Sequence, residues 1–171
     1  MRRLRDVPPP TGLRRLAYRL PIAIYRARLG WILGARFLLL QHRGRRSGAL
    51  RETVLEVVRS DRERGVWYVV SAWGERAQWL LNLRAEPRVR IETAGRMRSA
   101  EAREVSSEEA EEVIADYGRR HPHAMRWLAR HLGWEIEAAE QDFRALASVT
   151  RVVELRAVVG DATRPGASTS R

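Results

Sequence analysis

The sequence contains no cysteine, which excludes disulfides, iron–sulfur ligation, thiolate zinc sites and cysteine nucleophiles. Long hydrophobic runs are also missing. The most apolar region, Leu29–Leu40, is interrupted by Arg36 and falls far short of the roughly 18 residues that a membrane-spanning helix requires. The same region lies too far along the chain for a signal peptide and is followed by no small-residue cleavage pattern. We therefore expect a cytoplasmic protein.

Lysine is absent as well, so every basic side chain other than histidine is an arginine. Residues 1–51 carry thirteen arginines against one acid, Asp6, whereas residues 52–171 carry nineteen arginines against twenty acids. Nearly all of the net charge of +11 therefore lies in the first third of the chain. Such a distribution points to an anionic partner, which is a phosphate-bearing cofactor, an acidic membrane surface or nucleic acid.

A chain of 171 residues with 44% hydrophobic residues fits one globular domain. We expect a flexible leader over residues 1–11, a single domain over 12–158 and a disordered tail over 159–171. Within the domain, residues 13–29 show helical periodicity with many arginines. This segment either packs on the domain with its arginines in solvent or rests peripherally on the inner face of an anionic membrane.

The rest of the pattern predicts six strands and several helices. The strands are predicted over residues 36–42, 50–58, 66–71, 88–92, 97–105 and 149–158, and the helices over 75–85, 106–119, 124–131 and 136–146. This order indicates an α+β fold with mainly antiparallel strands and flanking helices. Short hairpins favour a small barrel, because closing the sheet removes its exposed edges.

The most distinctive local feature is the turn Gly44-Arg-Arg-Ser-Gly48 between two predicted strands, with Arg43 before it and Arg51 after it. Glycines allow left-handed backbone angles, so that successive N–H groups can point into one concavity. Guanidinium groups form paired hydrogen bonds to phosphate or carboxylate oxygens. The turn is therefore either an anion site or an ordinary hairpin with solvated charges.

A second feature is a strand that runs through a glycine turn at Gly74 into a helix. The start of such a helix offers backbone donors to a ligand. Trp73 and Trp79 either stack on a planar ring or pack in the core. His121 and His123, at a helix break, are either surface groups or proton donors, and no nearby carboxylate completes a metal site with them. We expect no metal.

Three segments occur in a set order: Arg36-Phe-Leu-Leu-Leu40 with Gly44-Arg-Arg-Ser-Gly48 and Arg51-Glu-Thr-Val54, then Val69–Gly74, then Trp79-x-x-Asn82-Leu-x-Ala-x-Pro87. Together they resemble the deazaflavin-dependent nitroreductase family. The resemblance covers about residues 21–156. It implies a split β-barrel that binds coenzyme F-420, an 8-hydroxy-5-deazaflavin with a phosphate and an oligoglutamate tail. It also implies hydride transfer to a small organic acceptor such as a quinone, an enone or a nitroaromatic compound.

The resemblance assigns roles to individual residues. The phosphate and tail would be held by Arg45, Arg46, Ser47, Gly48 and Arg51, and the ring by Ser71, Ala72, Trp73, Gly74, Trp79 and Asn82. Members that reduce nitro compounds carry tyrosines where this chain has His121–Trp127. His121 and His123 are the candidate catalytic residues in that segment.

Two alternatives are weighed against the deazaflavin enzyme. An FMN oxidoreductase of the related split-barrel class also needs a phosphate site, but FMN has no acidic tail, so four clustered arginines favour the deazaflavin. A nucleic-acid-binding module is supported only by basic charge, because aromatic residues are sparse in the basic third and no helix-turn-helix is recognisable. We expect no nucleic-acid partner. Split barrels often pair, so a homodimer is a further expectation.

Overall fold

The computed structural model describes residues 2–3, 35–71, 74–131, 133–137 and 139–158. The predicted helical segment 13–29, most of the leader 1–11 and the tail 159–171 lie outside these residues. Residues 2 and 3 of the leader form a short strand, β1 (Arg2–Arg3), which pairs with β7 (Trp134–Glu135). Among the described residues, none of the helices combines the length and the apolar character needed to cross a bilayer.

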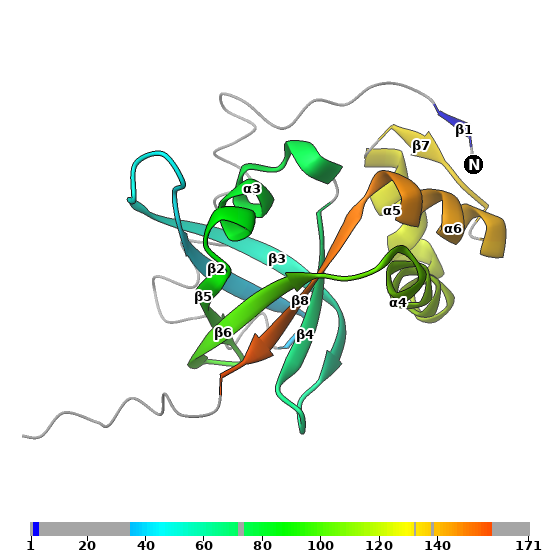
Figure 1. The fold of residues 1–171 in the computed structure, drawn as a ribbon. Coiled ribbons are helices and arrows are strands. Elements are labelled where there is room, and N and C mark those ends of the chain that lie inside the picture. The colour runs from blue at the N-terminus through cyan, green and yellow to red at the C-terminus, as the bar shows by residue number, and fades with distance from the viewer. Residues whose placement is uncertain (1, 4–34, 72–73, 132, 138, 159–171) are drawn as a thin grey trace, which may run out of the picture.

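Six antiparallel strands form a closed barrel in the order β2-β3-β4-β8-β6-β5 (Figure 1). Their bounds are β2 (Phe37–Arg43), β3 (Leu50–Asp61), β4 (Val66–Ser71), β5 (Arg88–Thr93), β6 (Arg96–Glu104) and β8 (Arg151–Ala157). All six predicted strands are present, and the predicted α+β fold with a small barrel is confirmed. The barrel closes through the pairing of β2 with β5, which extends over only three register pairs from Leu39 to Gln41.

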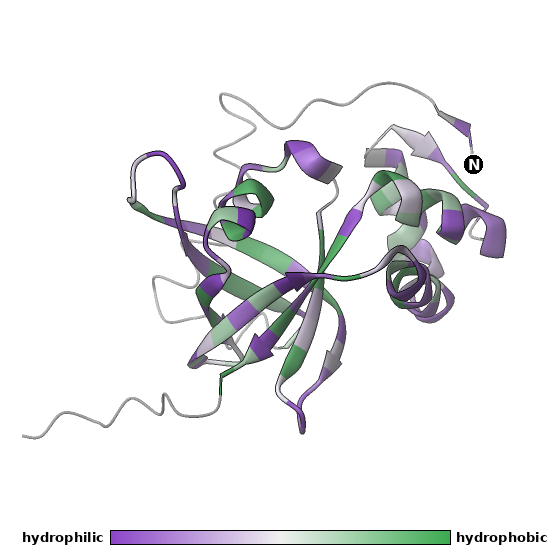
Figure 2. Ribbon diagram, viewed as in Figure 1, coloured by the Kyte–Doolittle hydropathy of each residue, from purple (hydrophilic) through white to green (hydrophobic). Residues whose placement is uncertain are grey.

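Strand alternation fills the barrel. Leu38 and Leu40 of β2 are fully buried and pack with Val69, Ile91 and Leu155 of other strands. Each such side chain contributes roughly 1.5–3 kcal/mol by leaving water. Figure 2 shows the contrast between the hydrophobic strands and the hydrophilic hairpin loop that joins β2 to β3.

The end of the barrel near this loop is covered by the helix α3 (Gln78–Ala85). Leu80 and Leu83 of α3 belong to the same hydrophobic cluster as the barrel interior. The sequence predicts one helix over residues 75–85, but the structure divides this segment into a 3₁₀ turn, η2 (Gly74–Arg76), and α3. The break lies at Ala77, whose backbone is extended with φ of −68° and ψ of 121°, so that the α-helix begins only at the next residue.

Three further helices gather on one side of the barrel (Figure 1): α4 (Ser107–Arg120), α5 (Pro122–His131) and α6 (Glu140–Val149). They form a second hydrophobic cluster against the outer face of β3, β4 and β8. The start of α4 is as predicted, since the Ser106 hydroxyl accepts a hydrogen bond from the Glu109 backbone N–H. The start of the last helix is predicted at residue 136 but lies at Glu140, because Ala139 is extended and the Asp142 carboxylate accepts hydrogen bonds from the backbone N–H groups of Glu137 and Ala139.

Candidate functional site

The predicted anion loop is a tight hairpin with its arginines at the tip. The Gly44 N–H donates to the Ala49 carbonyl at 2.9 Å, and the Gly48 N–H donates to the Gly44 carbonyl at 2.7 Å. Gly48 has φ of 64°, which only glycine adopts without strain. Arg45, Arg46 and Ser47 are consequently turned outward and exposed.

Arg45 anchors this loop to α3. Its backbone N–H and its guanidinium Nη1 both donate to the Asn82 Oδ1, at 3.1 and 3.0 Å. The same guanidinium donates to the Gln78 Oε1 from both terminal nitrogens, at 3.2 and 3.1 Å. Gln78 and Asn82 are four residues apart and lie on one face of α3, so that both can reach a single arginine.

Asn82 has a second partner, His42, which the sequence reasoning missed. The Asn82 Nδ2 lies 3.2 Å from the His42 Nδ1, and both side chains are buried. Burial lowers the pKa of His42 below 6.5; a backbone hydrogen bond with Arg43 opposes this, and the positive charge of Arg51 reinforces it. The available signal was the alternation of β2, which places His42 on the inward face after Leu38 and Leu40.

The arginines of the loop lack acidic partners. Within the described part of the chain, no carboxylate lies within 4 Å of Arg43, Arg45, Arg46 or Arg51, although many other arginines are paired. Arg51 stands directly across the sheet from His42, at the base of the loop. Guanidinium groups without a carboxylate partner are able to bind phosphates and carboxylates.

Ser71 and Gly74 belong to the turn between β4 and α3. The buried Ser71 hydroxyl donates to the Gly74 carbonyl at 2.8 Å. A Cβ on Gly74 would lie 2.9 Å from the Val149 carbonyl oxygen, so this position has no room for a side chain. Both residues therefore hold the turn in place. Ala72 and Trp73, predicted to line the ring, lie outside the described residues.

Trp79 is half-buried on α3 and packs against the barrel cluster. This tryptophan therefore contributes to the packing between α3 and the barrel. Its role as a wall of the ring site stays a prediction.

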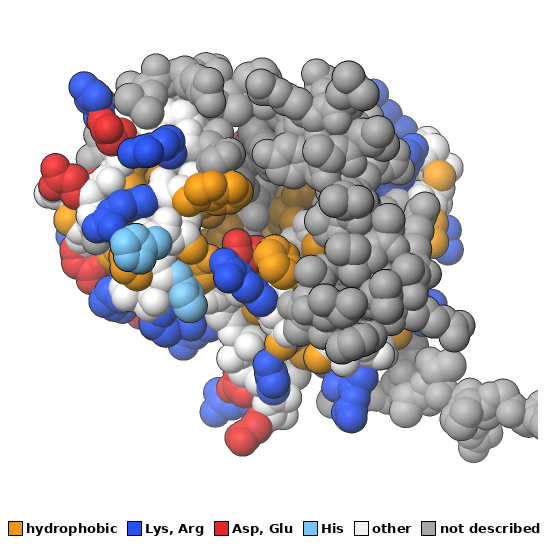
Figure 3. All heavy atoms as spheres, turned by 180° about the vertical axis from the view of Figure 1, so that it is seen from behind, with side chains coloured by type: hydrophobic (Ala, Val, Ile, Leu, Met, Phe, Trp, Pro, Cys, Tyr) orange, Lys and Arg blue, Asp and Glu red, His pale blue; other side chains and the backbone are white. Residues whose placement is uncertain are grey.

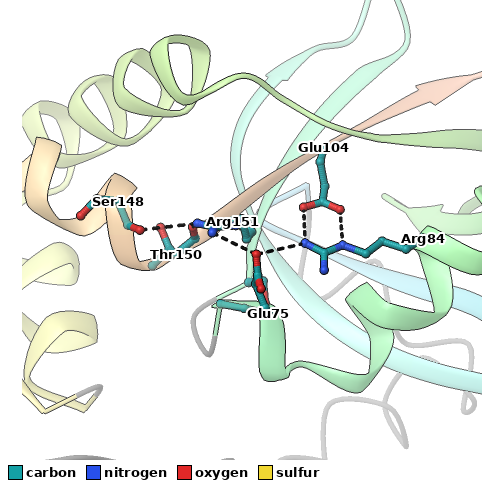
Figure 4. A network of polar contacts seen from close by, with 8 residues as sticks. Glu75, Arg84, Glu104, Ser148, Thr150 and Arg151 are labelled. Carbon is teal, nitrogen blue, oxygen red and sulfur yellow. Dashed lines mark hydrogen bonds and ion pairs between the residues drawn. The ribbon is translucent and has the colours of Figure 1, made fainter.

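A charged network fixes the turn and α3 to the strands beside them (Figure 4). Glu75 accepts from Arg151 of β8 at 3.1 Å and lies 3.6 Å from Arg84 of α3. Arg84 in turn makes a two-pronged ion pair with Glu104 of β6, at 2.6 and 2.8 Å. The Arg84 hydrogen bonds hold the pKa of Glu104 below its ordinary value. The segment that carries the predicted ring residues is thus braced on two strands.

A separate apolar pocket lies between the three helices and the barrel. It is lined by Val58, Val70, Ile114, Tyr117, Met125, Leu128, Ala129, Leu146 and Thr150. Figure 3, seen from behind, shows a hollow flanked by hydrophobic side chains among charged ones. The Tyr117 hydroxyl donates to the Glu56 carboxylate at 2.6 Å, and burial together with this contact raises the pKa of Tyr117. Its phenol is therefore neutral.

The two candidate catalytic histidines lie on the helical side of the molecule. Both are exposed, and the ring of His121 lies 5.0 Å from the ring of Tyr117, which lines the apolar pocket. No described contact joins either histidine to the arginine loop. The described residues contain no group of three metal-ligating side chains.

The closed six-stranded barrel with its capping helix defines a split β-barrel domain, and an exposed basic hairpin extends from it. The sequence matches the F-420H(2)-dependent quinone reductase family over residues 17–127, and the chain belongs to that family. It is accordingly an F-420-dependent reductase, and its cofactor is coenzyme F-420. The FMN alternative is not supported.

Solved structures with a similar fold are distant in sequence. A protein of unknown function from Agrobacterium tumefaciens is 17% identical, with 88% of this chain and 59% of that chain covered and a TM-score of 0.51. A structure described as a domain-swapped dimer is 17% identical, covering 80% of this chain and 99% of that chain, at 0.50. A structure of an F-420-H2-dependent reductase (FDR-A) is 19% identical over 71% and 94%, at 0.48. The first two show a shared fold. No curated protein matches this sequence.

Proposed function

We propose that this enzyme transfers a hydride from reduced coenzyme F-420 to a planar, apolar acceptor of the quinone class. The observation that carries this proposal is the loop from Arg43 to Arg51, whose exposed arginines have no carboxylate partner among the described residues. A cofactor with a phosphate and several glutamates would neutralise them. Enones and nitroaromatic compounds are the alternative acceptors.

The donor groups of the loop fit this cofactor. Arg46 and Arg51 can each present a planar pair of N–H groups to a phosphate or carboxylate. When bound, the coenzyme supplies the hydride, while the chain binds, orients and shields the reacting ring. We assign the phosphate and tail to Arg45, Arg46, Ser47, Gly48 and Arg51.

The ring itself would lie near the turn after β4. Gly74 and Trp79 flank this turn, and Ser71 supports it from within. Ala72 and Trp73 complete the proposed ring site by sequence position. The brace through Glu75 keeps this segment fixed relative to β8, which limits the reorganisation that a bound ring would require.

The acceptor would approach the ring from the helical side, next to the apolar pocket. The free space of this pocket is about 20 Å³, enough for one water molecule, so its side chains would have to move to admit a ring. Among the described residues, the lining of this pocket carries no charged side chain, which suits an uncharged ring and disfavours a charged one. Reduction of a quinone takes up one hydride and one proton. We propose His121 as the proton donor, since its ring lies beside Tyr117 at the pocket wall, and His123 as the second candidate.

Two further proposals concern assembly and location. A homodimer is supported by the similar structure that is described as a domain-swapped dimer. Light scattering on the purified protein tests it. We also propose a cytoplasmic location, with peripheral contact at the inner face of the membrane through residues 13–29. Flotation with anionic vesicles at low salt tests this contact, and failure to float would exclude it.

The central experiment is a titration of the protein with oxidised and reduced coenzyme F-420, followed by tryptophan fluorescence, with FMN in parallel. We expect tight binding of the deazaflavin and weak binding of FMN. Replacing Arg46 and Arg51 by alanine should weaken binding by about 1.5–3 kcal/mol for each charged hydrogen bond lost. Unchanged affinity would remove the loop from the proposed site.

The matched control replaces Arg88 and Arg90 of β5 by alanine. Both are exposed arginines without a described ion pair, and both lie on a strand outside the loop. The control removes the same two positive charges, so it should change the affinity for the coenzyme only through the long-range electrostatic field of the protein. Turnover with quinones, enones and nitroaromatic compounds then ranks the acceptors, and a preference for charged acceptors would contradict the apolar pocket.

A further inference from the structure

A chain of three side chains connects the barrel interior to the basic loop. His42 lies at the inner face of β2 and is 5% exposed, Asn82 on α3 is 6% exposed, and Arg45 lies at the exposed loop tip. The Asn82 amide contacts His42 on one side and Arg45 on the other. These residues come from three different elements, so the contacts fix β2, α3 and the loop relative to one another.

The orientation of the Asn82 amide follows from its partners. Its Oδ1 faces two donors, the backbone N–H and the guanidinium of Arg45, and must therefore be the oxygen. Its Nδ2 then donates to the Nδ1 of His42, which must be the unprotonated ring nitrogen. Both lone-pair positions of Oδ1 are in use, and the residue is buried. Little remains of Asn82 to contact a ring.

Without the hydrogen bonds to Asn82 and Gln78, Arg45 would be an exposed side chain with many rotamers. Held by Asn82 and Gln78, its backbone and its guanidinium are both fixed. Holding the loop before the ligand arrives reduces the entropy lost on binding. Gln78 is exposed and bonds only to the guanidinium of Arg45 within the loop, whereas the buried Asn82 also holds the Arg45 backbone.

We propose that Asn82 is a positioning residue for coenzyme binding: its amide, oriented by the buried His42, holds Arg45 and the basic loop in place for the phosphate and acidic tail. This assignment rests on the proposed function of the loop. It differs from the expectation that Asn82 lines the deazaflavin ring. It also adds the buried His42, which is not among the residues assigned to the ligand, as the residue that selects the amide orientation.

The two roles of Asn82 are separated by comparing two ligands. One is complete coenzyme F-420, and the other is the truncated deazaflavin that lacks the phosphate and glutamates. For Asn82→Leu, we expect about tenfold weaker binding of the complete coenzyme, because the hydrogen bond that holds the Arg45 guanidinium is lost. Binding of the truncated ligand should not change. In turnover assays KM for the complete coenzyme should rise while kcat is kept.

Two variants at His42 test the same proposal without altering either Asn82 or Arg45. Asparagine carries a side-chain oxygen close to the position of the Nδ1 of histidine, so His42→Asn retains an acceptor for the Asn82 amide. His42→Leu removes it. We expect His42→Leu to weaken binding of the complete coenzyme only, and His42→Asn to restore most of the loss. Thermal melting establishes whether each variant is folded. If Asn82→Leu does not fold, the comparison of His42→Leu with His42→Asn tests the proposal.

Equal weakening of both ligands by Asn82→Leu would show that Asn82 contacts the ring and would overturn the proposal. Equal affinity of His42→Leu and His42→Asn for the complete coenzyme would show that His42 does not orient the Asn82 amide. Failure of the loop itself is a different result: the Arg46 and Arg51 double variant would then bind the complete coenzyme as tightly as the wild type.

Discussion

Gly118 on α4 lies against Phe143 of α6, and replacing it by alanine tests how closely these two helices pack. A Cβ at this position would lie 2.3 Å from the Phe143 Cε1 and 2.6 Å from its Cζ. Carbon atoms prefer separations of about 3.5–4.0 Å. The phenyl ring would therefore have to move by more than about 1 Å, yet Phe143 is 2% exposed and enclosed by the helical cluster.

Two opposing terms set the size of the effect. Overpacking a well-packed core costs about 1–3 kcal/mol. Replacing glycine by alanine inside a helix returns about 0.5–1 kcal/mol, because alanine loses less backbone entropy. The short distance places this site toward the upper end of the overpacking range. We expect Gly118→Ala to destabilise the protein by about 2 kcal/mol, equivalent to a fall of roughly 4–8 °C in Tm for a chain of this size.

Urea denaturation followed by circular dichroism measures this change, with the m value as a check that the transition remains comparable. The double variant Gly118→Ala with Phe143→Leu is the control, because a smaller side chain leaves space for the new methyl group. Its destabilisation should be less than the sum of the two single variants, by about 0.5–3 kcal/mol. A neutral or stabilised Gly118→Ala protein would refute the reasoning.

Three other variants test separate parts of the structure. Gly74→Ala should lower the free energy of unfolding by about 1–2 kcal/mol for its left-handed backbone, and by a further amount for the close contact with Val149. Gly95→Ala, at φ of 73° with open space around it, should lose only the backbone contribution. Equal losses of stability in denaturation would contradict this. Glu104→Gln should destabilise the protein above pH 4.5, where the native carboxylate is paired. The difference from wild type should vanish as the pH falls through the lowered native pKa of Glu104, and a pH-independent difference in Tm would be the contrary result. Tyr117→Phe should cost about 1 kcal/mol in denaturation for its lost hydrogen bond to Glu56, and an unchanged midpoint would show that this contact contributes nothing.

Local signals predicted most of the barrel. The strand Val66–Ser71 is found with the bounds that the charged turn before it and the glycine turn after it indicate. The start of α4 follows from Ser106 and Glu109, whose hydrogen bond forms as the capping pattern predicts. Both features depend on residues within a few positions of one another, which is why the sequence alone reveals them.

The failures come from distant contacts. The strand Trp134–Glu135 was not predicted, because it forms only by pairing with Arg2–Arg3, more than 130 residues earlier in the chain. The partner of Asn82 was missed for the same reason, since His42 and Asn82 are 40 residues apart and meet only when α3 covers the barrel end. Periodicity places a residue on a face, but it does not identify what another element brings to that face.

The long strand β3 connects the two parts of the proposed site. It begins at Leu50 beside the basic loop, and its later part reaches Val58, which lines the apolar pocket, where the pairing with β4 shifts between Val57 and Arg59. At about 3.3 Å per residue, Arg51 and Val58 are roughly 23 Å apart along the strand. This stretch of backbone has a fixed length, so any molecule that contacts both the basic loop and the apolar pocket must span it. Point substitutions leave that length unchanged, whereas inserting a single residue would lengthen it and reverse the faces of every side chain beyond the insertion.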